Sequence, residues 1–365
     1  MYIWSSYGIR TLGLCRNFKS SLRRYDGCIA LTKGSKVYTV YKQQSERLGY
    51  LHPQYNYLNI ISPSNSYPSQ FQRTCRRRKL PIGSSFSLFT YTHQSTTMPA
   101  ITLRQVQKDP NRKDIFGILN DYIQPGSTTT VSQAATSSTQ SVKTPDEGFF
   151  WEFWDSIFDV AQQIPHSDPA QDKLALFVRE LTLVPETGDQ VWERRVWTDL
   201  PLLGPSAREH LEGITADAAG VSFHAFIARL LHAGVSPWSE TNAIWMLRRA
   251  LEEEKAESYR DSGEFDHDLA TAAVYIEYAG ATLVQKLALR PEPQLDEAER
   301  RSLRGGELWD KDASGLTADR WAFWGKRFRE LGGDKARGAE TKELALHAAR
   351  LIEVWAQTRL SAGTS

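Results

Sequence analysis

Residues 222–234 read SFHAFIARLLHAG, and their spacing decides the class of fold. Large apolar side chains recur every three or four residues from Phe223 to Leu231, which is the repeat of one buried helix face. Gly234 follows at the position where a helix commonly ends. A second helical pattern opens at Ser236 after a short connection, so we expect two adjacent, antiparallel helices.

The same helical pattern continues on both sides of this stretch. Thr144, Pro145 and Glu147 form a capping box with proline at the first helical position. The helix that follows, to residue 163, carries aromatic side chains on more than one side, so we expect it to be packed from two directions. Further apolar stripes predict helices at about 111–123, 167–183, 236–251, 268–289 and 317–331, and a last one from Asp334 through Trp355.

Strand patterns are scarce by comparison. The sequence has no run of alternating β-branched residues long enough to predict a sheet. Small residues in the helix predicted at 268–289, among them Ala273, Ala279 and Gly280, would let another helix approach closely. We therefore predict an all-α fold, an irregular multi-helix bundle of about seven to nine helices with a disordered N-terminal region.

Met98 marks a change in composition that divides the chain. Before it, fourteen Lys and Arg face only two acidic residues, and all three cysteines occur there. After it, forty-one acidic residues face thirty basic ones, and ten of the eleven tryptophans occur there. These differences predict a disordered or non-native leader at 1–97, a short helix with a Ser/Thr-rich linker at 98–144, and an all-helical domain at 145–358. The linker is expected to form at best a weak helix.

The leader admits several interpretations. Arg10, Arg16 and Lys19 precede its first acidic residue among serines and apolar residues, as in a mitochondrial presequence. The basic cluster at 73–79 is typical of nuclear-import or nucleic-acid patches. We favour a third interpretation, in which Met98 starts the natural protein and the leader is translated sequence from an overlong gene model. Plain disorder is the remaining alternative.

Several classes of function find no support in the composition. The part after Met98 has no cysteine for a disulfide or thiolate metal site, and no apolar run approaches the roughly 20 residues that span a bilayer. Its net charge of about −11 argues against nucleic-acid binding. No phosphate-loop, dinucleotide, zinc-protease or nucleophile-elbow motif occurs, so no residue is assigned to catalysis, a cofactor or a metal. We expect a cytoplasmic protein, or a mitochondrial one if the first residues are translated.

One short segment could nevertheless contribute to a catalytic site. Glu264, Asp266, His267 and Asp268 place three carboxylates and an imidazole within five residues, types that bind hard cations or transfer protons. The competing interpretation is that Asp266 or Asp268 caps the helix predicted to begin at Asp268, and that the others favour its positive end. His224 and His232 lie eight residues apart with no third metal ligand beside them in sequence. An enzyme would have to assemble its site from distant residues, around Asp266, His267 and His224.

Tryptophans are the other candidates for a binding site. Five of them could line an aromatic pocket for an apolar or cationic ligand: Trp151, Trp154, Trp245, Trp321 and Trp324. The alternative is that they belong to the core, where each large ring stabilises the fold by roughly 2–3 kcal/mol on burial. The exposure of each side chain decides between the two.

The order of the aromatic segments resembles that of a known family. The matching segments are FWEFWD at 150–155, IPH at 164–166, WTDLP at 197–201, FHAFIARL at 223–230, WMLRRALE at 245–252, YAG at 278–280 and TADRWAFW at 317–324. In this order they resemble a fungal family of uncharacterised helical proteins, catalogued as domain of unknown function 3632, over residues 114–355. The resemblance implies a helical fold, a fungal source and a start at Met98. It supplies no activity, substrate or catalytic residue.

The leading functional hypothesis is a non-enzymatic intracellular helical domain that binds a protein partner or a small apolar ligand. It rests on abundant aromatic residues without a polar constellation. The enzyme assembled around Asp266, His267 and His224 is the alternative. A scaffold that pairs with itself through an exposed apolar patch is a third possibility.

Overall fold

The computed structural model describes most of the chain after Met98 and five short stretches before it. After Met98 the described residues are 99–105, 110–140, 142, 145–236, 238–290, 294–309 and 313–360, and before it they are 3–5, 8–10, 22–25, 28–33 and 36–41. The chain divides into two units, residues 1–93 and 94–365, and each is considered by itself.

The first unit contains two small antiparallel sheets. β1 (Ile3–Ser5) pairs with β2 (Gly8–Arg10), and β3 (Leu22–Tyr25), β4 (Cys28–Lys33) and β5 (Lys36–Tyr41) form a three-stranded sheet in chain order. Strands of three to six residues hold too few alternations for a sequence pattern to predict them. The basic cluster at 73–79 and Met98 itself lie outside the described residues. The interpretation of 1–97 as a disordered or non-native leader stays a prediction.

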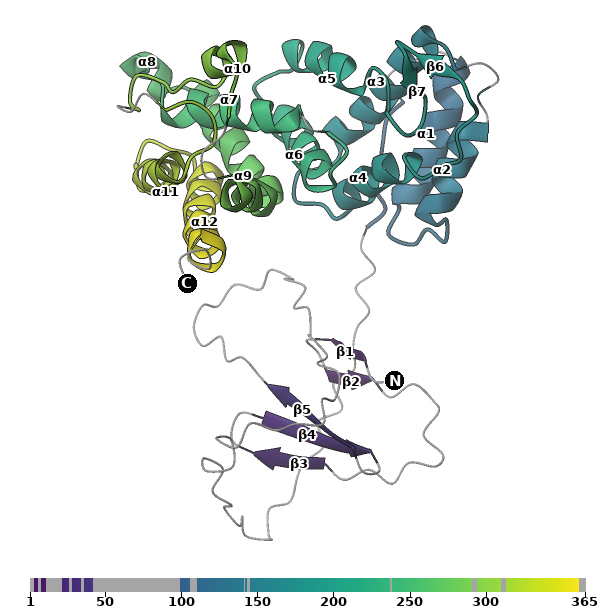
Figure 1. The fold of residues 1–365 in the computed structure, drawn as a ribbon, viewed down its shortest axis with the longest axis horizontal. Coiled ribbons are helices and arrows are strands. Elements are labelled where there is room, and N and C mark those ends of the chain that lie inside the picture. Colours follow the sequence, from purple (N-terminus) through teal and green to yellow (C-terminus); the bar gives the residue numbers. More distant parts are fainter. Residues whose placement is uncertain are drawn as a thin grey trace. The chain divides into compact units, whose positions relative to one another are not determined.

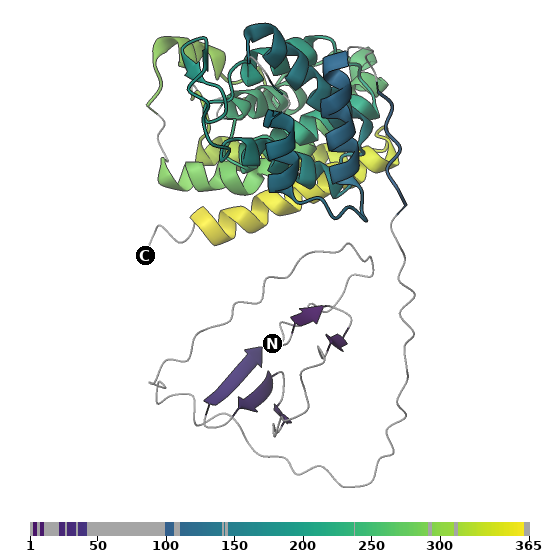
Figure 2. The same ribbon diagram turned by 90° about the vertical axis from the view of Figure 1, so that its right-hand side faces the viewer.

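The second unit is an irregular bundle of helices, which confirms the predicted all-α class (Figures 1 and 2). The longer helices are α1 (Pro110–Ile123), α2 (Val131–Gln140), α3 (Glu147–Gln163), α4 (Ala170–Leu181), α5 (Leu203–Glu212), α6 (Ala218–His232), α7 (Ser239–Leu251), α9 (Gly263–Leu289), α11 (Ala318–Gly332) and α12 (Ala339–Trp355). The shorter elements are α8 (Glu257–Arg260), α10 (Glu297–Ser302), the π-helical turn η2 (Ala356–Leu360) and the hairpin of β6 (Gln190–Val191) and β7 (Arg194–Arg195). The twelve α-helices of the described residues exceed the predicted seven to nine, because α2, α5, α8 and α10 arise in segments with weak apolar periodicity.

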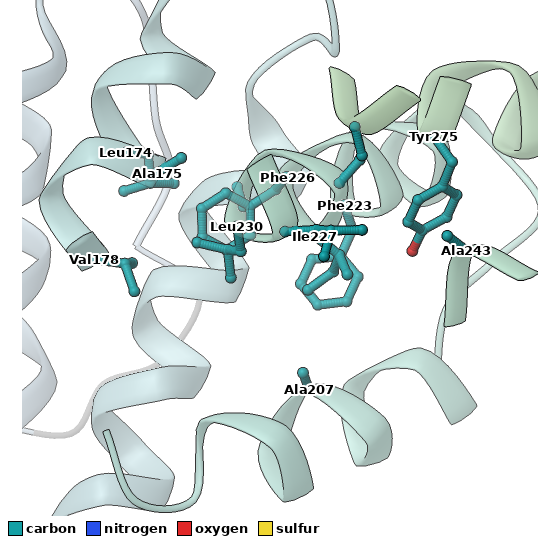
Figure 3. Packing of buried hydrophobic residues seen from close by; sticks show 14 of the residues in the cluster. Leu174, Ala175, Val178, Ala207, Phe223, Phe226, Ile227, Leu230, Ala243 and Tyr275 are labelled. Carbon is teal, nitrogen blue, oxygen red and sulfur yellow. The ribbon is translucent and has the colours of Figure 1, made fainter. Parts of the chain in front are cut away.

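Helix α6 lies at the centre of this bundle. Twelve of its fifteen residues are buried, as expected for a helix packed on several sides. Helices α3 and α4 pack against one side of it, and α7 and α9 against another (Figure 1). Figure 3 shows Phe226 and Leu230 facing Leu174 and Val178 of α4, with Tyr275 of α9 on the other side. The contact between α6 and α7 is the one that their short connection predicts.

Helix α9, of 27 residues, receives α12 along a face of small residues. Trp355, the last residue of α12, lies directly against Gly280. A Cβ atom at Gly280 would overlap the Trp355 ring, so only glycine permits this approach. The prediction that Gly280 lets another helix come close is confirmed.

Two predicted helix starts can be compared with the observed caps. The observed cap of α3 is Asp146, and Thr144, which the sequence predicts as the cap, lies outside the described residues. The Asp146 carboxylate accepts a 2.8 Å hydrogen bond from the Phe149 N–H, and its extended backbone places the oxygen over the free amides. The cap of α11 is confirmed, since Thr317 Oγ1 accepts a hydrogen bond from the Arg320 N–H.

Two other helices begin elsewhere than predicted. α9 begins at Gly263, five residues before the predicted Asp268. α12 begins at Ala339, although the sequence favours a start at Asp334. The Asp334 carboxylate instead accepts a 3.0 Å bond from the Ala336 N–H, two residues on, which closes a turn in place of a helix cap.

Candidate functional site

The polar residues predicted for an enzyme are only partly brought together. His224 of α6 and His267 of α9 face each other with ring centroids 6.4 Å apart. Nδ1 of His224 lies 3.2 Å from the Tyr275 hydroxyl, which also receives a hydrogen bond from the Asn242 amide. These four side chains, from α6, α7 and α9, are called the His224 cluster below. Asp266, the third predicted residue, does not join it.

Burial controls protonation in the His224 cluster. Only 4% of His224 is exposed, and this loss of hydration lowers its pKa to about 3, with the charges of His267 and Arg249 adding to the effect. Burial likewise lowers the pKa of His267 and raises the pKa of Tyr275. Both imidazoles are therefore neutral at pH 7. A substrate could reach His224 only by displacing packed side chains.

Asp266 belongs to a different junction, between α9 and α12. One of its oxygens lies 2.8 Å from Nη1 of Arg337, and the other accepts a 2.8 Å bond from the Gly338 N–H. Gly338 is the cap position of α12, so Asp266 supplies the acceptor that this helix start lacks in its own sequence. The Arg337 guanidinium is buried and lies over the Phe265 ring.

The interpretation of Asp266 and Asp268 as caps of α9 is wrong, because the helix begins before them. Ser262 occupies its cap position. Asp268 lies inside the helix, where it accepts bonds of 2.9 Å from Arg249 Nε and 2.7 Å from the Tyr259 hydroxyl. Asp266 does lie in the first turn, where a carboxylate favours the positive end of the helix dipole.

Two kinds of feature are missing from the described part of the chain. No three His, Cys, Asp or Glu side chains there gather closely enough to hold a metal ion. No helix there is both long and apolar enough to cross a membrane. The two histidines of α6 have separate neighbours: Nδ1 of His232 lies 3.0 Å from Thr282 Oγ1, whereas His224 contacts Tyr275.

The five tryptophans predicted to line a pocket lie on three helices. They are Trp151 and Trp154 on α3, Trp245 on α7, and Trp321 and Trp324 on α11. Trp154, Trp321 and Trp324 are fully buried, and the indole N–H of Trp154 donates a 2.7 Å bond to the Pro201 carbonyl. These three act as core residues. Trp151 and Trp245 are half-buried.

A buried ion pair that no sequence pattern indicates joins α7 to α11. Glu252 and Arg320 are both fully buried, with Nε of Arg320 at 2.6 Å from Oε1 of Glu252 and Nη2 at 2.9 Å from Oε2. The Trp324 indole N–H donates to the same carboxylate at 2.5 Å, and the guanidinium also donates to the Leu303 and Gly315 carbonyls. Glu252 is the first of three consecutive glutamates, a pattern typical of a solvent-exposed helix end, yet its side chain is fully buried. It instead anchors the long connection between α9 and α11.

A tight turn at residues 190–195, called the Trp192 turn below, presents an aromatic side chain to solvent. β6 pairs with β7 so that Trp192 and Glu193 form a two-residue loop. Both have positive φ, 51° and 59°, which the type I′ turn requires and which Asn and Gly normally fill. A bulky residue is strained there by roughly 1–2 kcal/mol. Because 54% of Trp192 is exposed, burial of its ring does not account for the strain.

Glu147, the first residue of α3, fixes the indole of Trp192. Its Oε2 atom accepts a 3.0 Å bond from Trp192 Nε1, and its Oε1 atom lies 3.4 Å from Trp151 Nε1. One carboxylate therefore holds two indoles that are far apart in sequence. These three side chains are called the Trp192 surface below. The sequence does not signal it, because turns of this type are recognised by Asn-Gly or Asp-Gly pairs.

Acidic residues outnumber basic ones along the segments that form the Trp192 surface. The acids of residues 146–147 and 186–199 are Asp146, Glu147, Glu186, Asp189, Glu193 and Asp199, and the only basic residues there are Arg194 and Arg195. Arg195 is paired with Asp199 at 2.9 Å, and this hydrogen bond holds the pKa of Asp199 below its usual value. The segments therefore carry a net negative charge.

Most of these buried and exposed residues lie in the part of the chain that a protein-family model matches. A family model described as Protein of unknown function (DUF3632) matches residues 154–328. The DUF3632 match confirms the resemblance read from the sequence, over a shorter span than the expected 114–355. It includes Trp192, the His224 cluster and the Glu252–Arg320 pair, but not Glu147 or Trp151. No curated protein and no solved structure matches the chain.

Proposed function

We propose that the second unit is a non-enzymatic protein-binding domain whose partner docks on the Trp192 surface. The observation that carries the proposal is Trp192 itself, an exposed indole held on a left-handed backbone. Tryptophan is among the residue types that most often dominate the binding energy of protein interfaces. A fixed, solvent-facing indole therefore suits recognition better than folding.

The strain at Trp192 supports the same conclusion. Gly or Asn in its place would relieve strain of roughly 1–2 kcal/mol and would leave the buried core unchanged. Backbone strain that the fold does not need is concentrated at binding and catalytic sites. The hydrogen bond to Glu147 also holds the ring in one orientation, which reduces the entropy lost when a partner immobilises it.

The charge of the Trp192 surface favours a basic partner. A Lys or Arg side chain can pack its cation over the exposed indole face while its charge complements the surrounding carboxylates. The positive charge of Arg195 repels such a cation only weakly, because Arg195 is already paired with Asp199. We therefore take the occupant to be a Lys- or Arg-bearing segment of another protein. We place the interaction in the cytoplasm, since the domain has neither cysteines nor glycosylation sequons.

Photo-crosslinking of the full chain in its native cell tests this proposal. A photo-reactive residue replaces the exposed Gln190, two positions from Trp192, and mass spectrometry identifies the attached peptide. We expect one dominant product in which the attached segment is rich in Lys and Arg. Adding Trp192→Gly should abolish it, and because glycine suits the positive φ, the loss cannot be attributed to a damaged turn.

Leu289→Gly is the matched control. Leu289 is also apolar and 74% exposed, but it ends α9 and does not contribute to the Trp192 surface. This variant should keep the crosslink. A product that survives Trp192→Gly, or an attached segment without basic residues, would contradict the proposal.

A further inference from the structure

Two glutamine side chains hold an extended segment of the chain by its backbone. The segment is residues 99–105, called the arm below. The Ile101 N–H donates to Oε1 of Gln124 at 2.9 Å, and Nε2 of Gln124 donates back to the Ile101 carbonyl at 3.0 Å. Gln163 binds Arg104 in the same way: its Oε1 accepts from the Arg104 N–H at 2.7 Å, and its Nε2 donates to the Arg104 carbonyl at 2.9 Å. Each carboxamide thus binds both the backbone N–H and the carbonyl of one residue of the arm.

The two clamps are built by the helix ends themselves. Gln124 immediately follows α1, and Gln163 is the last residue of α3. The second hydrogen of each Nε2 is bonded to the carbonyl four residues earlier, that of Asn120 in one case and Asp159 in the other, both at 2.9 Å. Both bonds join residues four apart, which is the spacing of about one helical turn. The amides are therefore oriented by their own helices and do not depend on the arm.

The arm lies on the bundle in the manner of a bound peptide. Ile101 and Leu103 are half-buried and pack against the core, whereas Thr102 and Arg104 are exposed. This alternation is that of an extended chain with one face on a surface. The clamped residues are three apart, which an extended chain spans in roughly 10 Å. Contacts of this kind select a ligand by its backbone groups and by two apolar side chains separated by one residue. They do not select the side chains that face the solvent.

Space for a longer ligand exists beside the first clamp. An open hollow of about 500 Å³ adjoins Ala100 and Ile101, and its other lining residues are Asn120, Asp121, Gln124, Pro125 and Gly126. Residues that precede the clamped position in a peptide could extend into this hollow.

We propose that this groove binds an extended apolar-x-apolar segment of another protein, and that the arm occupies it in cis. The fit of the arm shows what the groove accepts, and the preformed clamps keep it competent when the arm leaves. A tethered arm competes at an effective concentration of roughly 1 mM, so a free peptide binds only weakly until the arm is displaced. The groove lies at the opposite end of α3 from Glu147, about 24 Å away at 1.5 Å per residue, so this proposal and the Trp192 proposal can fail separately.

Fluorescence anisotropy with a labelled peptide of the arm's own sequence, PAITLRQ with blocked ends, tests the proposal. The full chain is compared with the double variant Ile101→Asp, Leu103→Asp, which removes the apolar anchors of the arm but leaves the groove intact. The peptide should bind the variant at least about 10-fold more tightly than the wild type, because the competing arm is gone. Adding Gln163→Leu to the double variant should reduce that binding at least about 10-fold.

Two control peptides distinguish recognition of the backbone from non-specific hydrophobic binding. N-methylation at the Ile and Arg amides should abolish binding, because it removes both clamped N–H groups. Changing the Thr and Arg side chains to Ser and Lys should leave binding unchanged. Equal binding of the N-methylated peptide would overturn the proposal, as would failure of the folded double variant to bind any peptide.

Hydrogen exchange on the unmodified chain keeps the test valid if the double variant does not fold. At saturating peptide, the Ile101 and Arg104 amides of the arm should lose protection while the rest of the bundle keeps it. Unchanged protection would show that the arm is not replaceable. A concentration-dependent dimer of the wild-type chain that the double variant does not form would also overturn the proposal, since the groove would then hold the arm of a second copy of this chain.

Discussion

The Trp192 turn and the Glu252–Arg320 pair are both locally unfavourable, but they differ in the contacts that offset the free-energy cost. At the pair, two charges are removed from water, but each is bonded to the other and to further groups from α11 and the connection before it. At the turn, a bulky residue has positive φ and its ring stays in solvent, with one hydrogen bond to Glu147. The fold itself explains the pair. The fold does not explain the turn in the same way, and the proposal that a partner docks on the Trp192 surface rests on this difference.

The largest expected effect comes from breaking the buried pair. Glu252→Ala should lower the free energy of unfolding by about 3–5 kcal/mol, because Arg320 is left buried without a counter-charge. Urea unfolding followed by the helical circular dichroism signal measures it. Glu253→Ala is the control, since this neighbouring carboxylate is only half-buried and should contribute less than about 1 kcal/mol. Similar small losses for both variants would show that the pair does not stabilise the fold.

Tryptophan substitutions sharpen the comparison between buried and exposed aromatic residues. Trp154→Ala should cost about 3–5 kcal/mol, since it leaves a cavity in a fully buried site and an unpaired Pro201 carbonyl. Trp238→Ala should cost less than about 2 kcal/mol, because that ring is half-buried where it lies against Gly204. Thermal or urea unfolding gives both values. Equal losses would refute the assignment of one residue to the core and the other to its edge.

Acid should destabilise the domain through the His224 cluster. The unfolded chain takes up a proton at His224 near the ordinary pKa of 6.5, whereas in the folded state the pKa is about 3. This contribution is fully present above pH 6.5 and is lost as pH falls toward 3, by up to about 1.4 kcal/mol per pH unit. Urea unfolding at pH 7, 6, 5 and 4 measures the slope. His224→Gln should flatten this slope, and an unchanged slope in that variant would contradict the assignment.

The smallest expected effect is a gain in stability at the Trp192 turn. Glu193→Gly should raise the free energy of unfolding by about 1 kcal/mol, because glycine adopts the φ of 59° without strain. Glu193→Ala, which keeps a Cβ atom, should change little. Differential scanning calorimetry can resolve the two. A glycine variant less stable than the wild type would show that the turn is not strained, and would remove the main argument for the Trp192 surface.

The sequence predicts those parts of the fold that depend on near neighbours. The stripe of α6, the aromatic character of α3, the cap at Thr317 and the closeness allowed by Gly280 all follow from spacing or from one residue type. Boundaries shift where a distant residue takes over a local role. Asp266 is an example, since it caps α12 from a position 72 residues before Gly338.

The candidate sites could not be predicted because their partners are distant. Glu252 reads as a solvated residue until Arg320, 68 positions away, is placed beside it. Gln163 meets Arg104 across 59 positions, and no property of a glutamine at a helix end indicates that it will hold another strand of chain. Trp192 is the clearest failure. Its left-handed backbone contradicts the propensity of its own residue type, so a local pattern would always argue against the turn.

The contact of Trp355 with Gly280 bears on where the smallest folding unit ends. The DUF3632 match stops at residue 328, yet the ring that covers Gly280 belongs to a helix that begins at Ala339. A fragment cut at the limits of the match would expose that notch and the whole face of α9 that α12 covers, and at its other end it would also lack α1, α2 and the start of α3. The residues that match the family model are therefore fewer than the residues that the domain needs to fold by itself. A recombinant piece of this protein should keep every residue from the arm to Trp355.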